Sequence, residues 1–184
     1  MAAPRMAPIV NSQSNLRVLV SADQIRRRIA EMAAQIDRDY PQEPVLLIGI
    51  LKGSFIFLSD LARALSRSNA RIEFMAVSSY GKGKTSSGEV KVVKDLDISI
   101  EGSHVIVVED IVDSGVTLTY LVGLLSQRQP KSLKLATLLD KPERRMRPVK
   151  VDYVGFTIPD EFVVGYGLDF AEDYRNLRDV CILK

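Results

Sequence analysis

The sequence predicts one α/β domain, with a mainly parallel sheet flanked by helices. Apolar runs of strand length alternate along the chain with longer segments whose apolar residues recur at helical spacing. The run at 105–108 is unbroken and β-branched, which is typical of a central strand that is buried on both faces. A length of 184 residues suits a single domain with a full hydrophobic core.

The composition argues against several classes of protein. A formal net charge of +2 is too small to indicate nucleic acid as an obligatory partner. No apolar run approaches the length that crosses a bilayer, so we expect no membrane partner. The one cysteine, Cys181, cannot form an intrachain disulfide, which fits a reducing cytoplasm. Residues 1–15 lack the apolar core of a secretory signal, and we interpret them as a disordered extension of a single domain at 16–184.

The first predicted helix spans residues 22–39. Ser21 and Gln24 form a capping-box pattern at its start. Apolar residues then recur near helical spacing at Ile25, Ile29, Met32 and Ile36. Residues 26–28 are three arginines on the polar side, where a solvated helix face is a better interpretation than a nucleic-acid patch.

An apolar run at 45–51 predicts the first core strand, and a helix is expected from about 54 to 66. The inward residues of this helix are predicted to be Phe55, Leu58, Leu61, Ala62 and Leu65. The turn between the two elements contains Gly53, and glycine lets a backbone approach a ligand closely. Many strand-to-helix turns contain glycine, so this turn alone is weak evidence for a site.

Three further strands are predicted, at 71–78, 90–94 and 105–108. A polar connection at 95–103 joins the last two. The segment at 79–89 is rich in Gly, Ser, Thr and Lys, which predicts a mobile loop or lid. A surface hairpin loop is the simpler alternative.

The most informative stretch follows the strand at 105–108. Glu109 and Asp110 come at its carboxyl end, and a hydroxyl-rich turn at 113–117 opens into a predicted helix at 117–128. In parallel α/β sheets, ligands bind outside the carboxyl ends of the strands, where a helix start favours an anion such as phosphate. Acidic residues beside such a turn indicate a ligand that also brings sugar hydroxyls, a metal ion or a proton. A solvated turn with capping residues is the simpler alternative.

The next strand is predicted at 133–139, after Pro130, and it ends in the sequence Asp-Lys-Pro. Lys141 stands out because it lies at the same sheet edge as the central turn, although a lysine in this position is usually only solvated. We interpret the basic residues from 144 to 150 as a surface connection, followed by a short strand at 151–156.

An aromatic, glycine-punctuated segment spans residues 158–170. Phe162, Tyr166 and Phe170 recur every four residues, which fits a core stripe on a helix. One proline and two glycines within the segment argue against a regular helix. An aromatic ring on irregular backbone can instead stack on a planar base. The composition gives the core stripe and the stacking surface equal weight.

These features together resemble one known family. The pattern at 105–117 (apolar strand, Glu-Asp, two apolar residues, Asp-Ser-Gly, a variable residue and Thr) resembles the phosphoribosyl diphosphate (PRPP) signature of type I phosphoribosyltransferases. Four more stretches are similar in order and spacing to the shorter, bacterial hypoxanthine (hypoxanthine-guanine) phosphoribosyltransferases: 51–54, 79–81, 139–142 and 160–169. The resemblance runs from about Ser21 to Leu183. It implies the type I phosphoribosyltransferase fold, with a small hood built from the N-terminal part and residues 151–184.

The resemblance also implies an activity and a site. The reaction would transfer the 5-phosphoribosyl group from PRPP to hypoxanthine, and also to guanine, giving IMP or GMP and diphosphate in purine salvage, with Mg²⁺ as cofactor. PRPP and nucleotide binding are implied for Lys52, Gly53, Ser79, Tyr80, Glu109, Asp110, Asp113, Ser114, Gly115, Val116, Thr117 and Arg175. Purine binding is implied for Lys141, Phe162, Val163 and Asp169, and metal binding for Glu109, Asp110 and Asp169. Asp113 would be the general base, or the hydrogen-bond acceptor, for the ring proton of the purine.

A homodimer or homotetramer is also implied. Two other interpretations stay open: a regulatory protein that binds RNA or DNA on the same fold, and an enzyme that prefers xanthine or guanine. The small net charge and the presence of Asp113, Lys141 and Phe162 favour the hypoxanthine enzyme over the regulatory protein. Val116 and Ser54 depart from relatives that carry lysine and glycine, respectively, at these positions.

Overall fold

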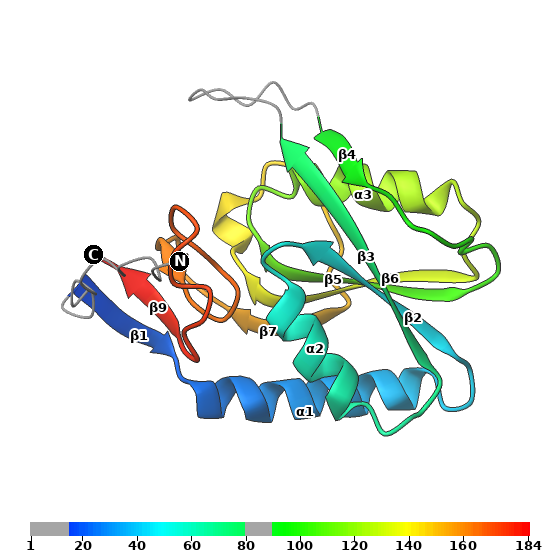
Figure 1. The fold of residues 1–184 in the computed structure, drawn as a ribbon, viewed down its shortest axis with the longest axis horizontal. Coiled ribbons are helices and arrows are strands. Elements are labelled where there is room, and N and C mark those ends of the chain that lie inside the picture. Colours follow the sequence, from blue (N-terminus) through cyan, green and yellow to red (C-terminus); the bar gives the residue numbers. More distant parts are fainter. Residues whose placement is uncertain (1–14, 80–89) are drawn as a thin grey trace, which may run out of the picture.

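The computed structural model describes residues 15–79 and 90–184, and the predicted mainly parallel sheet is its central element (Figure 1). Six strands form this larger sheet in the order β4-β3-β2-β5-β6-β7. Their bounds are β2 (Val45–Leu51), β3 (Ala70–Ser79), β4 (Val90–Lys94), β5 (His104–Val112), β6 (Ser132–Asp140) and β7 (Tyr153–Thr157). Neighbouring strands are parallel except β3 and β4, which are antiparallel. The carboxyl ends of the parallel strands therefore meet at one edge.

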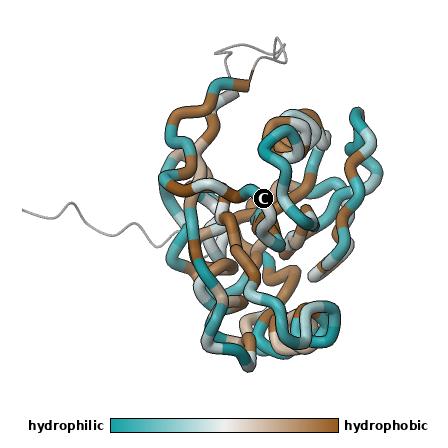
Figure 2. The backbone as a smooth tube through the Cα atoms, turned by 90° about the vertical axis from the view of Figure 1, so that its right-hand side faces the viewer, coloured by the Kyte–Doolittle hydropathy of each residue, from teal (hydrophilic) through white to brown (hydrophobic). Residues whose placement is uncertain are grey.

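Helices cover both faces of the larger sheet (Figure 1). They are α1 (Ala22–Asp39), α2 (Phe55–Ala64) and α3 (Val116–Ser126). Ile106 and Val108 of β5 are buried in the core with α1 and α2, whereas Val105 and Val107 are buried in the core with α3. The predicted burial of this strand on both faces is confirmed, and hydrophobic stretches run through the middle of the molecule in Figure 2. Within the described ranges, none of the helices has both the length and the apolar character that crossing a bilayer requires.

Helix α1 begins as the sequence predicts. The Ser21 hydroxyl accepts a hydrogen bond from the N–H of Gln24, and the Gln24 side chain accepts one from the N–H of Ser21. The arginines that follow are not all simply solvated. Arg28 donates from Nη2 to the backbone oxygen of Val154 (2.7 Å), and so ties α1 to β7.

Helix α2 corrects one expectation about the core. Phe55 is predicted to point inward, but it is 41% exposed. The buried residues of this helix are Phe57, Leu58 and Leu61. Ser54 is fully buried, and its Oγ donates to the backbone oxygen of Ile50 (2.7 Å), which fixes how the chain enters the helix. Phe57 is therefore buried in place of Phe55, whereas the predicted burial of Leu58, Leu61 and Leu65 is confirmed.

A second, smaller sheet joins segments near the two ends of the chain. Its antiparallel strands, in the order β1-β9-β8, are β1 (Leu16–Val20), β8 (Val163–Val164) and β9 (Val180–Leu183). No strand is predicted for residues 16–20, which form only five positions of mixed burial. The short strand β7 lies in the range 151–184 that we assign to the hood, but it pairs with β6 in the larger sheet. Gly165 (φ 96°) and Gly167 (φ 103°) are left-handed, so no helix crosses the aromatic segment.

An ion-pair network at the amino ends of β6 and β7 yields a stability prediction. Asp39 accepts hydrogen bonds from Lys134 Nζ (2.8 Å) and the Tyr153 hydroxyl (2.7 Å), and these bonds lower the pKa of its carboxyl from 3.8. Asp39→Asn is expected to lower the free energy of unfolding by about 1–2 kcal/mol near neutral pH, because Lys134 loses its charged partner. A lowered native pKa gives stability that is present above 3.8 and lost as the pH falls through the native value.

Urea unfolding of wild type and Asp39→Asn across the acid range measures this effect. The stability difference should shrink as the pH is lowered below 3.8. A difference that stays constant with pH contradicts the assignment of the Asp39 carboxylate as the stabilising group.

Candidate active site

Four parts of the chain meet at the carboxyl edge of the larger sheet. They are the turn after β2, the end of β5 with the turn before α3, the end of β6 with the short helix η2 (Pro142–Arg144), and the segment 160–175. The N–H of Lys141 donates to the backbone oxygen of Val112 (2.9 Å), which joins the ends of β6 and β5. The residues that the sequence predicts as a site therefore come from segments that lie together.

The turn after β2 is packed between two other segments of this edge. A Cβ on Gly53 would overlap the Asp110 carboxylate, and a Cβ on Gly167 would overlap the backbone oxygen of Gly53. The peptide bond that joins Leu51 and Lys52 is cis. Glycine is therefore required at 53 because the carboxylate of β5 occupies the space of a side chain.

The carboxylates of β5 lie on the strand, which continues past them to Val112. Glu109 Oε2 is shielded from solvent and has no hydrogen-bond partner among the described residues. Burial raises the pKa of Glu109 well above its usual value, and the negative charge of Asp110 adds to this effect. Burial also raises the pKa of Asp110 to about 6, although the N–H of Ile111 and the charge of Arg175 act in the opposite direction. The anionic forms of both carboxyl groups are therefore disfavoured in this environment.

The predicted phosphate turn leads into α3 with a left-handed glycine. Gly115 (φ 78°) is the N-cap residue of α3, and a Cβ there would overlap the backbone oxygen of Arg147. Ser114 Oγ accepts a hydrogen bond from the N–H of Val116 (3.4 Å), and Thr117 is in the first turn. The first N–H groups of a helix lack intrahelical acceptors and carry partial positive charge, so this turn is suited to an anion.

Asp113 lies at the start of this turn and is paired with an arginine. Arg144 Nε donates to Asp113 Oδ1 (3.0 Å), and Arg144 Nη1 lies 3.4 Å from Asp160 Oδ2. Arg145 Nη1 donates to the backbone oxygen of Asp113 (2.7 Å). We interpret the segment 144–150 as a surface connection in the sequence analysis, but its first two arginines contact the predicted catalytic residue.

Lys141 is buried, unlike most lysines at strand ends. It is 7% exposed, and its Nζ donates to the backbone oxygen of Glu161 (2.6 Å) and lies 3.8 Å from Asp160 Oδ1. Burying an amine requires hydrogen-bond partners, and one donated bond leaves further N–H donors for a ligand.

The three aromatic residues of the terminal segment have different environments. Tyr166 is buried, whereas Phe162 is 54% and Phe170 is 52% exposed. The rings of Phe162 and Phe170 meet edge to face, with centroids 5.7 Å apart. A common core stripe is therefore wrong for two of the three. Val163, next to Phe162, is buried in β8 and pairs with Ile182 of β9.

A charged cluster lies beside the turn after β2. Arg175 Nη2 is 2.8 Å from Asp169 Oδ1, and its Nη1 donates to the backbone oxygen of Gly167 (2.8 Å). Glu172 lies 2.9 Å from Lys52 Nζ and 3.6 Å from Arg175 Nη2. This cluster places the Arg175 guanidinium, which the resemblance assigns to the diphosphate, near the side chain of Lys52, a residue for which the resemblance implies a backbone contact.

Two predicted site residues lie at the limit of the described chain. Ser79 is the last residue of β3. Tyr80 and the rest of the predicted lid at 79–89 fall outside the described residues.

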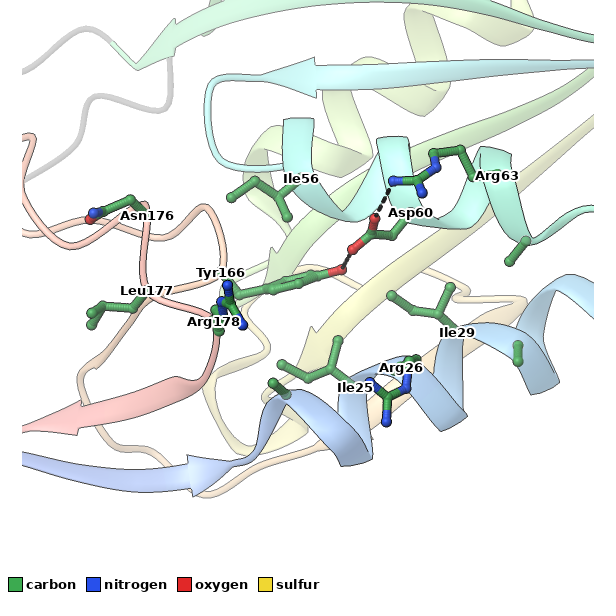
Figure 3. Close-up of a pocket in the computed structure, with 13 residues that line it drawn as sticks. Ile25, Arg26, Ile29, Ile56, Asp60, Arg63, Tyr166, Asn176, Leu177 and Arg178 are labelled. Atoms are coloured by element: carbon green, nitrogen blue, oxygen red, sulfur yellow. Dashed lines mark hydrogen bonds and ion pairs between the residues drawn. The ribbon is translucent and has the colours of Figure 1, made fainter.

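A cavity of about 560 Å³ lies away from this edge, between α1, α2 and residues 176–178 (Figure 3). Apolar side chains line much of it, and the Tyr166 hydroxyl donates to Asp60 (2.6 Å) within it. Burial and this hydrogen bond raise the pKa of Tyr166, so its hydroxyl stays neutral. None of the predicted site residues lines this cavity, and we place the chemistry at the sheet edge.

Comparison with known proteins identifies the family. A model of the phosphoribosyl transferase domain matches residues 19–171. The chain belongs to this family. It is 49% identical over 168 residues to a hypoxanthine-guanine phosphoribosyltransferase of Bacillus subtilis, covering 91% of the chain and 93% of that protein. It is 48% identical over 170 residues to the enzyme of the same name from Aquifex aeolicus, covering 92% and 95%.

A solved structure supports the same family. The crystal structure of a hypoxanthine phosphoribosyltransferase from Staphylococcus aureus superposes with a TM-score of 0.91 at 45% identity, covering 96% of each chain. The predicted type I phosphoribosyltransferase fold is therefore confirmed.

Two residues at the carboxyl edge of the larger sheet are not predicted as site residues from the sequence. Arg144 contacts Asp113, which is 31 positions away in the sequence, and Glu172 contacts Lys52, which is 120 positions away. The basic character of segment 144–150 was the only signal for the first contact. For the second, an acidic residue near Arg175 carried no distinguishing pattern.

Proposed function

We propose that this phosphoribosyltransferase acts in purine salvage and transfers the 5-phosphoribosyl group from PRPP to hypoxanthine, and also to guanine, giving IMP or GMP and diphosphate. The observation that carries the proposal is the position of the buried amine Lys141. Its Nζ donates to the backbone oxygen of Glu161, next to the exposed ring of Phe162, and its N–H donates to the backbone oxygen of Val112, next to Asp113. A 6-oxopurine needs a donor for its exocyclic oxygen and a flat surface for its ring, and these residues supply both.

PRPP would bind along the same edge. The first N–H groups of α3 and the hydroxyls of Ser114 and Thr117 bind the 5′-phosphate. The carboxylates of Glu109 and Asp110 accept hydrogen bonds from the ribose hydroxyls. The backbone of Lys52 and Gly53, together with the Arg175 guanidinium, binds the diphosphate.

The carboxylates of this edge fit Mg²⁺. Glu109 Oε2 is buried and has no hydrogen-bond partner among the described residues, and burial raises the pKa of Asp110 to about 6, which disfavours its anionic form. Among the described residues no three His, Cys, Asp or Glu side chains form a ready metal cluster. Glu109 and Asp110 would hold one ion and Asp169 a second, directly or through water, together with oxygens of PRPP. When bound, the ion neutralises negative charge on the departing diphosphate.

The purine contacts explain both proton removal and selectivity. Asp113 accepts the ring proton at N7 as the N9 bond forms. Lys141 donates to O6, Phe162 stacks on the ring, and the main chain of Val163 contacts the pyrimidine edge. Adenine presents an amino group where Lys141 needs an acceptor, so two donors would face each other and the base is disfavoured.

We also propose that the enzyme works in the cytoplasm as a homodimer or homotetramer. The reaction needs shielding from water, and the segment from Ser79 through Tyr80 to residue 89 is proposed as the lid.

A base panel tests the function. Purified protein is given PRPP and Mg²⁺ with hypoxanthine, guanine, xanthine or adenine, with and without a chelator. We expect IMP and GMP formation that the chelator abolishes, with little product from adenine. Preference for xanthine would move the assignment to the related xanthine enzyme. No product from any base, together with tight and salt-dependent nucleic-acid binding, would favour the regulatory protein.

The turn after β2 gives a further prediction. In Gly53→Ala the new methyl group would overlap the Asp110 carboxylate, so either the turn or the carboxylate must move. We expect kcat/KM for PRPP to fall about 100-fold, because small displacements of positioning groups cost this much. Gly123→Ala is the control, since a Cβ there meets no atom within 4 Å. Equal kinetics for the two variants would contradict a role of the turn in PRPP binding.

A further inference from the structure

We propose that Tyr166 is a positioning residue for the diphosphate of PRPP. Its hydroxyl lies in the cavity between α1 and α2, away from the carboxyl edge, and is bound to Asp60 of α2. It acts through its neighbour Gly167. The inference rests on the proposed function, because it takes the backbone of the turn after β2 and the Arg175 guanidinium as the diphosphate site.

Gly167, the residue that follows Tyr166, contacts both parts of that site. A Cβ on Gly167 would overlap the backbone oxygen of Gly53, so the two glycines pack backbone against backbone. The N–H of Gly167 donates to the backbone oxygen of Arg175 (2.9 Å), and Arg175 Nη1 donates to the backbone oxygen of Gly167 (2.8 Å). The position of Gly167 therefore sets where the turn after β2 and the guanidinium lie relative to each other.

The backbone at Tyr166 has an uncommon conformation that needs to be held. Gly165 (φ 96°), Tyr166 (φ 52°) and Gly167 (φ 103°) are all left-handed. Glycine adopts this region freely, whereas a tyrosine rarely does, because its Cβ crowds the backbone. Such a conformation persists only where surrounding contacts impose it. The N–H of Tyr166 donates to the backbone oxygen of Leu177 (2.9 Å), and its hydroxyl donates to Asp60 Oδ2 (2.6 Å).

The hydroxyl contact joins this segment to the helix that follows the diphosphate turn. Helix α2 begins directly after that turn, with Ser54 as its N-cap residue. Figure 3 shows the Tyr166 ring reaching across to Asp60 on this helix. Tyr166 is buried and its acceptor is a carboxylate, so the hydrogen bond is stronger than one between neutral groups. Both sides of the contact between Gly53 and Gly167 are therefore tied to α2.

The proposed base contacts are held by other interactions. Val163 and Val164 of β8 pair with Ile182 and Cys181 of β9. Lys141 Nζ donates to the backbone oxygen of Glu161. Neither interaction involves the Tyr166 hydroxyl. Loss of this hydroxyl should therefore loosen the diphosphate contacts and leave the base contacts in place, which general loss of structure would not do.

Tyr166→Phe tests the inference, with Tyr153→Phe as the matched control. The Tyr153 hydroxyl also donates to a carboxylate, that of Asp39 (2.7 Å), but at the amino ends of β6 and β7. Asp60→Ala removes the same bond as Tyr166→Phe while keeping the tyrosine, and Asp60→Asn keeps an acceptor for it. Steady-state kinetics give KM for PRPP and for hypoxanthine. Calorimetry gives the affinity for IMP, which contains no diphosphate, and thermal unfolding gives the stability of each variant.

We expect KM for PRPP to rise about three- to tenfold in Tyr166→Phe and in Asp60→Ala, a part of what one hydrogen bond to a charged group contributes. KM for hypoxanthine and the affinity for IMP should stay close to the wild-type values in both variants. Asp60→Asn should resemble wild type in all three measurements. Tyr153→Phe should lose thermal stability without a change in KM for PRPP.

Two results would overturn the inference while the proposed function stands. One is an unchanged KM for PRPP in Tyr166→Phe and Asp60→Ala, and the other is an equal loss of affinity for PRPP and IMP. If Tyr166→Phe does not fold, the comparison of Asp60→Ala with Asp60→Asn decides, because equal KM values for PRPP in these two variants contradict the role of the bond. No turnover by wild type with any base would overturn both the function and the inference.

Discussion

Asp113→Asn is expected to lower kcat for IMP formation by about 100- to 1,000-fold, within the range that general acid-base catalysis provides. The amide keeps the shape of the side chain, and the contact of Arg145 is to the backbone oxygen of residue 113, so the turn should be preserved. PRPP affinity should therefore change only a few-fold. Steady-state kinetics with PRPP and hypoxanthine varied in turn separate these effects.

The control for this variant is Asp160→Asn. Asp160 shares Arg144 with Asp113, at 3.4 Å and 3.0 Å respectively, so both substitutions remove a carboxylate from the same arginine. Only Asp113 is assigned to the proton of the purine, and Asp160→Asn should lose less than about tenfold in kcat, as for an exposed ion pair. Wild-type turnover by Asp113→Asn would remove this residue from the chemistry.

Lys141→Ala is expected to lower kcat/KM for hypoxanthine by about 10- to 100-fold, which corresponds to the loss of one charged hydrogen bond. Adenine should be affected far less, because its 6-amino group is a donor and offers this amine no acceptor at that position. The selectivity between the two bases should therefore collapse. The comparison requires kcat/KM for both bases in each variant.

Lys150→Ala is the matched control for Lys141→Ala. The Lys150 side chain is 87% exposed and pairs only with Asp152 among the described residues, in the connection between η2 and β7. Its removal should leave the ratio of hypoxanthine to adenine unchanged. An unchanged ratio in Lys141→Ala would show that another group selects the 6-oxo base.

Much of the fold could be predicted because local pattern and burial agree. The β-branched run at 105–108 is buried on both faces, and the capping box of Ser21 starts α1 at the expected residue. Phe55 was misplaced although Leu58, Leu61 and Leu65 of the same predicted face are buried. It is the first residue of α2, and periodicity alone does not show whether a terminal position is covered by the rest of the fold.

The site could be predicted only as a set of segments. Order along the chain indicates that strand ends share an edge, but it gives no distances between side chains. The pairing of Arg144 with Asp113 depends on how η2 folds back over the turn before α3. Phe162 points outward and Tyr166 points inward. The left-handed glycines at 165 and 167 redirect the backbone on both sides of Tyr166, so the two rings do not share one face.

The most direct test of the proposed activity measures both products of one reaction mixture. The 184-residue chain is incubated with PRPP, Mg²⁺ and hypoxanthine, and IMP and diphosphate are quantified together over time. Transfer at the carboxyl edge predicts that the two products accumulate in equal amounts and that neither forms without the base. Diphosphate release without IMP, or no product with hypoxanthine, guanine or xanthine, would contradict the assignment of this chain as a 6-oxopurine phosphoribosyltransferase.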